Sequence, residues 1–247
     1  MYDTGSLIYT AVSFVVTALF CVLFRKAGER SRLNILRVIA LLTLITHMIK
    51  PLYNFFADPG YLPGNDWSTM WPYYFCNFMM WMLPIAFCGP KVLKPLYPFV
   101  LWGSLWGGLI TIAYPDFYNA SNGIFSLGNF KSYLSHSLMI LAFCYAVASG
   151  EYKPRVRDVA VFFAGLVGAM LWGFFSNWLF AVTGKSDSLN SMYLRASAIG
   201  GTPFNGYLIG ILLTLGTALL CFAWEAATLP REERFTTKLR TLLERRA

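Results

Sequence analysis

Residues 159–183 read VAVFFAGLVGAMLWGFFSNWLFAVT, a run of 25 residues without a charged side chain. A helix needs about 20 apolar residues to cross the roughly 30 Å hydrocarbon core of a bilayer. Six further apolar runs accompany this one, bounded by Pro, Gly, Asn or clusters of charge. The seven predicted spans cover residues 6–24, 35–55, 70–88, 96–113, 132–150, 159–183 and 207–228.

The composition supports the same fold class. Of the 247 residues, 57% are hydrophobic and 13% are charged, whereas a soluble domain has about 25% charged residues. The alternating ten-residue strands of an outer-membrane barrel are absent from the sequence. The five cysteines show no CxxC pair, so neither a zinc ribbon nor a disulfide framework is indicated. We therefore predict an all-α membrane protein, a seven-transmembrane-helix bundle formed by residues 1–230.

Lysine and arginine are distributed unevenly between the loops. Of these residues, 16 fall on one side of the predicted membrane, six of them in the tail. The other side holds Lys131, Lys185 and Arg195, with Lys50 just inside the membrane. Because cytoplasmic loops carry the excess, the N-terminus is predicted outside and the C-terminus in the cytoplasm. The net charge of +8 then reflects topology rather than nucleic-acid binding, and residues 231–247 form a basic amphipathic tail on anionic inner-leaflet lipid.

Small residues recur at four-residue spacing in two of the spans. The pairs are Gly103/Gly107, Ala164/Gly168 and Ala169/Gly173. Such small-xxx-small patterns let membrane helices approach closely. We interpret all three pairs as helix-packing contacts.

Four polar side chains on four different spans are predicted to share one depth, in the outer half of the membrane. They are His47, Cys76, His136 and Asn177. Ionisable residues inside a bilayer are costly and are candidates for function by default. The supporting or substrate-binding candidates near them are Lys50, Asn77, Ser132 and the loop residue Arg195.

Cys76 shares this depth with the histidines, whereas the other four cysteines fall in the inner half of their spans. A buried thiol is inert unless a neighbour takes its proton, but a thiolate beside a histidine can attack an ester carbonyl. Either His47 or His136 could accept the proton. No metal or cofactor is predicted, because the two histidines lack i,i+4 spacing and a carboxylate at that depth. A small-molecule transporter or receptor built on the same His, Lys and Asn cluster is the alternative.

Three segments carry a resemblance to a known family. They are WPYYFCNFMMWMLPIAF at 71–87, SYLSHSLMILAFCYAVASGEYKP at 132–154 and GFFSNWLFAVTG at 173–184. In order and spacing they resemble the bacterial YwaF-like integral membrane proteins, which are similar to vertebrate transmembrane protein 164 and, more distantly, to the androgen-induced-gene-type lipid ester hydrolases. The resemblance implies a bacterial cytoplasmic membrane and transacylation of phospholipids through a Cys and a His on separate helices. Those roles fall on Cys76 and His136.

The predicted function is therefore that of an intramembrane phospholipid acyltransferase acting near the outer leaflet. Cys76 is the nucleophile and His136 the base, and the acyl group passes to a lysophospholipid or to water. Asn77, Asn177 or Ser132 would donate to the oxyanion, and Lys50, Lys131 and Arg195 would hold the phosphate headgroup. The long outer loops 114–131 and 184–206 either form a lid or simply cap the bundle. The predicted partners are phospholipid and lysophospholipid.

Overall fold

The computed structural model describes residues 4–57, 71–115, 125–184 and 189–244. These residues form helices and no β-strand, which confirms the predicted all-α class. In chain order the helices are α1 (Thr4–Phe24), α2 (Glu29–Ala57), α4 (Phe75–Cys88), α5 (Tyr97–Ala113), α6 (Leu127–Ala148), α7 (Asp158–Val182), α8 (Gly206–Thr228) and α9 (Phe235–Glu244). Three short 3-10 turns are η2 (Lys91–Leu96), η4 (Ser191–Tyr193) and η5 (Arg231–Glu233).

Within the described residues, six helical stretches are long and apolar enough to cross a membrane. They are α1, α2, α6, α7, α8 and the continuous stretch formed by η2 and α5. The remaining apolar helix, α4, has 14 residues. At 1.5 Å per residue it is about 21 Å long, which is less than the roughly 30 Å hydrocarbon core. In the described part of the predicted span 70–88, residues 71–74 are not helical, and the helix that begins at Phe75 is too short to cross the core alone.

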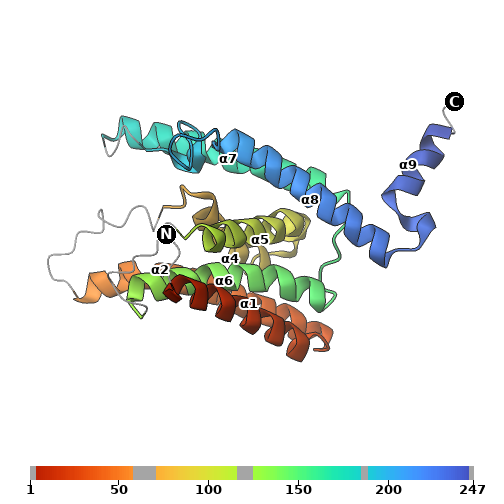
Figure 1. The fold of residues 1–247 in the computed structure, drawn as a ribbon, viewed down its shortest axis with the longest axis horizontal. Coiled ribbons are helices and arrows are strands. Elements are labelled where there is room, and N and C mark those ends of the chain that lie inside the picture. Colours follow the sequence, from red (N-terminus) through yellow and green to blue (C-terminus); the bar gives the residue numbers. More distant parts are fainter. Residues whose placement is uncertain (1–3, 58–70, 116–124, 185–188, 245–247) are drawn as a thin grey trace.

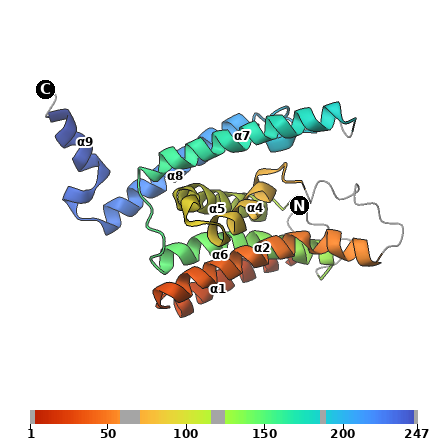
Figure 2. The ribbon, with the colours of Figure 1, turned by 180° about the vertical axis from the view of Figure 1, so that it is seen from behind.

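The helices are arranged in three layers, as both views show (Figures 1 and 2). One outer layer contains α1, α2 and α6, the middle layer contains α4 and α5, and the other outer layer contains α7 and α8. Helix α6 packs against α1, α2 and α5, while α7 joins the middle layer through α5. The most deeply buried residues belong to the middle layer and its contacts, including Val100, Leu101 and Met79, each 0% exposed.

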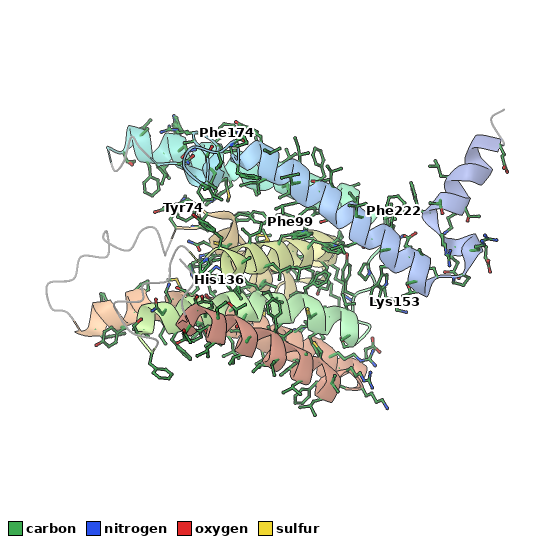
Figure 3. The ribbon with its side chains drawn as sticks, in the orientation of Figure 1. Tyr74, Phe99, His136, Lys153, Phe174 and Phe222 are labelled. Carbon is green, nitrogen blue, oxygen red and sulfur yellow. The ribbon has the colours of Figure 1, made fainter. Side chains whose placement is uncertain are left out.

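Glycines set the distance between the middle layer and its neighbours. At Gly108 an added Cβ would lie 2.7 Å from the main-chain oxygen of His136 on α6, and at Gly165 it would meet the ring of Phe99 (Figure 3). At Gly173 the nearest atom is Met192 Cγ, 2.8 Å away. Gly168 has nothing within 4 Å. The predicted packing role of Ala164/Gly168 is therefore wrong for Gly168, because α7 meets α5 through Gly165 instead.

The two ends of the bundle carry different residues. At the basic end, α1 stops, α2 starts and α6 leads into the loop that contains Lys153 (Figure 3). At the site end, α2 and α7 stop and α4, α6 and α8 start. Tyr74 and His136 both lie toward the site end (Figure 3). The loops counted as cytoplasmic from their Lys and Arg content therefore share one end of the structure.

A buried carboxylate joins α8 to the tail at the basic end. Glu225 is 6% exposed, and its two oxygens accept hydrogen bonds from the main-chain N–H groups of Val156 (2.8 Å) and Phe235 (2.9 Å). The rings of Phe222 and Phe235 also contact each other, with centroids 6.2 Å apart. Because an uncapped helix leaves its first N–H groups unsatisfied, Glu225 stabilises the start of α9.

Candidate functional site

Cys76 lies in the first turn of α4. Tyr74, two residues before Cys76, is the N-cap of α4. Its backbone is extended, and its side chain makes no capping hydrogen bond. The first intrahelical bond at this end runs from Phe78 N to Tyr74 O, at 2.9 Å. The N–H groups of Phe75, Cys76 and Asn77 consequently have no main-chain carbonyl within α4 to bond, because the i−4 residues lie before the helix. They point out of the positive end of the helix dipole, which favours an anion such as a thiolate.

The non-helical segment 71–74 is held inside the bundle by residues distant in sequence. Trp172 Nε1 on α7 donates to Pro72 O at 2.8 Å. Ser191 Oγ and Met192 N, from the loop after α7, both donate to Tyr73 O, at 2.7 and 2.8 Å. Irregular backbone is tolerated at membrane depth only when protein groups satisfy it. These bonds explain how α4 can begin within the bundle instead of at its surface.

Asn177 has a structural part in this arrangement. Its Oδ1 accepts a hydrogen bond from Ser191 N at 2.8 Å, so it holds the loop that in turn holds Tyr73. Asn177 is 4% exposed. Its amide nitrogen, Nδ2, is buried and has no hydrogen-bond partner among the described residues, so the role of Asn177 as an oxyanion donor stays a prediction.

The surroundings of Cys76 are partly polar. Its thiol donates to Asn77 Oδ1 at 3.5 Å, and the Asn77 N–H and the Thr111 hydroxyl are further hydrogen-bond neighbours of the sulfur. A Cβ at Gly107 on α5 would lie 3.4 Å from Cys76 Cα and 3.6 Å from its Cβ. Thr111 is one turn beyond Gly107 and donates to Gly107 O at 2.7 Å. The absence of a side chain at Gly107 thus allows α4 and its thiol to lie directly on α5.

His136 is oriented by its own helix. Nδ1 lies 2.6 Å from Ser132 O, and the side chain is 7% exposed. A carbonyl oxygen only accepts, so this contact assigns the hydrogen to Nδ1 and the lone pair to Nε2. Ser135 Oγ donates to the same oxygen at 3.1 Å. Ser132 therefore acts here through its main chain, and His136 has the tautomer of a base at Nε2.

Two consecutive glycines of α5 contact the helices that carry Cys76 and His136. Gly107 contacts Cys76 on α4, and the next residue, Gly108, contacts the main chain of His136 on α6. The charge of Lys131 acts on both Cys76 and His136. The structure thus brings the predicted nucleophile and base to one level of the bundle. The bond that the thiol makes is to Asn77 rather than to His136.

The other predicted residues lie on α2 and in the loop after α7. His47 is 3% exposed on α2, which packs against both α4 and α6. Pro51, four residues later, has no N–H to give to the His47 carbonyl. Lys50 belongs to α2, but its side chain lies outside the described residues. Arg195 is exposed in the loop after α7, where its N–H donates to Asn190 Oδ1 at 2.8 Å.

The structure describes more of the second long loop than of the first. The part of the second loop at 189–205 covers the start of α4 through Ser191 and Met192, which is more than a simple cap on the bundle. Most of the first loop, 116–124, lies outside the described residues. Across the ranges that the structure describes, no three His, Cys, Asp or Glu side chains are grouped so as to hold a metal ion.

One known protein family matches most of the chain. The sequence model of the TMEM164 family matches residues 1–226, which include every helix from α1 to α7 and most of α8. The chain belongs to the TMEM164 family. The match confirms the resemblance to transmembrane protein 164, and with the apolar helices it identifies an integral membrane protein. No curated protein and no solved structure is significantly similar to the chain.

In this TMEM164-family chain, sequence reasoning missed the residues that position the pair. The spacing predicts that Gly107 packs against another helix but does not say which helix, and it does not identify Gly108 or Thr111 at all. The late start of α4 was also missed. A signal was present in the sequence, since Pro72 disfavours a helical residue before it and lacks the N–H of a helix interior.

Proposed function

We propose that this member of the TMEM164 family is an intramembrane phospholipid acyltransferase, with Cys76 as nucleophile and His136 as base. The observation that carries the proposal is the start of α4 inside the bundle, which sets a thiol at a helix N-terminus on Gly107. The adjoining Gly108 holds the helix of His136 at the same level. A thiol beside positive dipole ends and a neutral histidine is the arrangement that produces a reactive thiolate.

The reaction proceeds in two balanced steps. In the first, His136 Nε2 takes the thiol proton, the sulfur attacks a phospholipid ester carbonyl and the carbon–oxygen bond breaks. The departing glycerol oxygen receives the proton from His136 and leaves as a lysophospholipid, so that a thioester remains on Cys76. In the second, a lysophospholipid hydroxyl gives its proton to His136 and attacks the thioester, the carbon–sulfur bond breaks, and the leaving sulfur takes the proton back from His136. If water replaces that hydroxyl, the product is a free fatty acid.

The oxyanion of each step needs hydrogen-bond donors. The main-chain N–H groups of Cys76 and Asn77 lie at the start of α4 and are hydrogen-bond neighbours of the reacting sulfur, so we assign them this role. One such donor is worth about 3 kcal/mol of transition-state stabilisation. Among the described residues, Lys131 is a cation whose charge acts on both reacting residues, and it is proposed to bind the phosphate. Lys50 and Arg195 remain candidates for the same headgroup.

The proposed orientation follows from the charges of the loops. Cytoplasmic loops are rich in Lys and Arg, so the basic end is assigned to the cytoplasm and the site end to the outside. Ester carbonyls lie just beneath the headgroups, and the site end would therefore meet the outer leaflet. By the family resemblance, the membrane is the bacterial cytoplasmic membrane.

The test uses purified protein, a diacyl phospholipid with labelled acyl chains and an unlabelled lysophospholipid. Mass spectrometry of wild type should show label in the acceptor, and Cys76→Ala and His136→Ala should abolish it. Cys88→Ala, at the opposite end of α4, is the matched control and should transfer normally. His47→Gln asks whether the second histidine serves as the base. Transfer by Cys76→Ala at the wild-type rate would refute the nucleophile.

One observation favours a second function. Transporters also build binding sites from discontinuous helices whose N-termini point into the bundle, and α4 is of this kind. A transporter does not need a sulfur at Cys76. Absence of transfer by wild type with several headgroups, together with an unchanged fold, would favour the transporter over the acyltransferase.

A further inference from the structure

An apolar groove of about 690 Å³ lies between α7 on one side and α4, η2 and α5 on the other. Its walls include Phe78 and Met82 from α4 and Ala164, Gly168, Trp172 and Phe175 from α7. Every residue lining it is apolar or aromatic, and the one indole N–H, that of Trp172, is already bonded to Pro72 O. The small residues Ala164 and Gly168 form its exposed floor. The groove therefore offers a ligand dispersion contacts and no hydrogen bond.

The size of the groove indicates what fills it. Its α7 wall runs from Val161 to Phe175, which at 1.5 Å per residue is about 21 Å. A hydrocarbon chain about 4 Å across needs about 260 Å³ for the same length, because carbons approach to that distance. One leaflet of hydrocarbon is about 15 Å deep, so the groove can hold most of an acyl chain.

The groove begins at the level of Cys76 but on another face of α4. Phe78 is two residues after Cys76, and at about 100° per residue it points about 200° away around the helix. Trp172 contacts Phe78, with centroids 6.2 Å apart, and stacks on Trp71 at 5.0 Å, so aromatic rings surround the end nearer the site. The start of α4 thus stands between the thiol and the groove.

We propose that this groove binds one acyl chain of a diacyl phospholipid, namely the chain that stays on the glycerol while Cys76 takes the other. A lipid whose headgroup lies over the start of α4 then places one chain on each side of that helix. This role in the reaction rests on the proposed acyltransferase function. Binding of a lipid chain in the groove does not depend on it.

The test fills the groove without disturbing the bundle. Gly168→Phe adds a ring at a position with nothing within 4 Å, so the chain should fold. Val167→Phe is the matched control, because Val167 is 41% exposed on the same helix and does not line the groove. Delipidated protein in detergent is titrated with a diacyl phosphatidylglycerol and bound lipid is counted by native mass spectrometry. Gly168→Phe should weaken binding about tenfold or more, the effect of losing two buried methylenes, and Val167→Phe should not. Equal binding by the two variants would overturn the proposal.

The same variants separate this inference from the proposed function. If wild type transfers no acyl group but the two variants still differ in lipid binding, the acyltransferase fails and the groove stands as a lipid site. If wild type transfers normally and Gly168→Phe alters neither lipid binding nor the KM for the donor, the groove is excluded and the acyltransferase stands. A raised donor KM in Gly168→Phe, with the KM for the lysophospholipid unchanged, supports both.

Discussion

Gly108→Ala inserts a methyl group where α5 meets the main chain of α6. The new Cβ would lie 2.7 Å from His136 O and 2.7 Å from Ile140 Cγ1, and ordinary contact begins at 3.4 Å. The helices must therefore separate by about 3.4 − 2.7 = 0.7 Å. Overpacking of this kind costs about 1–3 kcal/mol, and alanine's better helix propensity returns about 0.5–1 kcal/mol. We expect a net loss of about 0.5–2 kcal/mol in the free energy of unfolding.

Two other glycine-to-alanine variants make the measurement specific. At Gly107 the nearest atom is Met139 Cε, 3.0 Å away at the flexible end of a side chain, and at Gly168 nothing lies within 4 Å. Thermal unfolding in detergent should lower the Tm of Gly108→Ala by about 2–6 °C, with Gly107→Ala less affected and Gly168→Ala unchanged or more stable. Acyl transfer by Gly108→Ala should also fall, because a misplacement of about 1 Å can cost about 100-fold. A Tm for Gly108→Ala equal to that of Gly168→Ala would refute the packing argument.

Three further substitutions test contacts away from the thiol. Tyr152→Phe removes the hydroxyl that donates to Asp158 Oδ2 at 2.8 Å, and the loss of about 1–3 kcal/mol should appear as a lower Tm. Glu225→Gln leaves a single acceptor for two N–H groups at the basic end, so hydrogen exchange at the start of α9 should accelerate while the interior of α5 stays protected. Asn177→Ala removes the acceptor of the Ser191 N–H, and faster exchange and proteolysis are expected in 189–205; an unchanged loop would contradict the anchoring role.

Much of the fold could be predicted from local sequence, because apolar runs bounded by charge decide which segments enter a membrane. The 159–183 run corresponds to α7 at Asp158–Val182, and the other long spans agree in kind. Cys76 and His136 lie next to consecutive residues of α5, Gly107 and Gly108, while their depth in a membrane stays a prediction. The exceptions are the starts of helices. The span predicted from residue 132 begins at Leu127, where Ser126 Oγ accepts from Asn129 N, because this cap extends the helix into polar sequence.

The sequence by itself determined the all-α membrane class, the segregation of basic loops and the family resemblance, since these depend on composition and on spacing along one chain. The tertiary structure decided where α4 begins, because the acceptors at Pro72 and Tyr73 are satisfied by Trp172 and Ser191, about 100 residues away. It also decided that a side chain at Gly165 would meet Phe99 of α5 while one at Gly168, in the same groove, would meet nothing within 4 Å. A spacing rule identifies small residues on a helix, but only the position of the neighbouring helix determines which of them is covered.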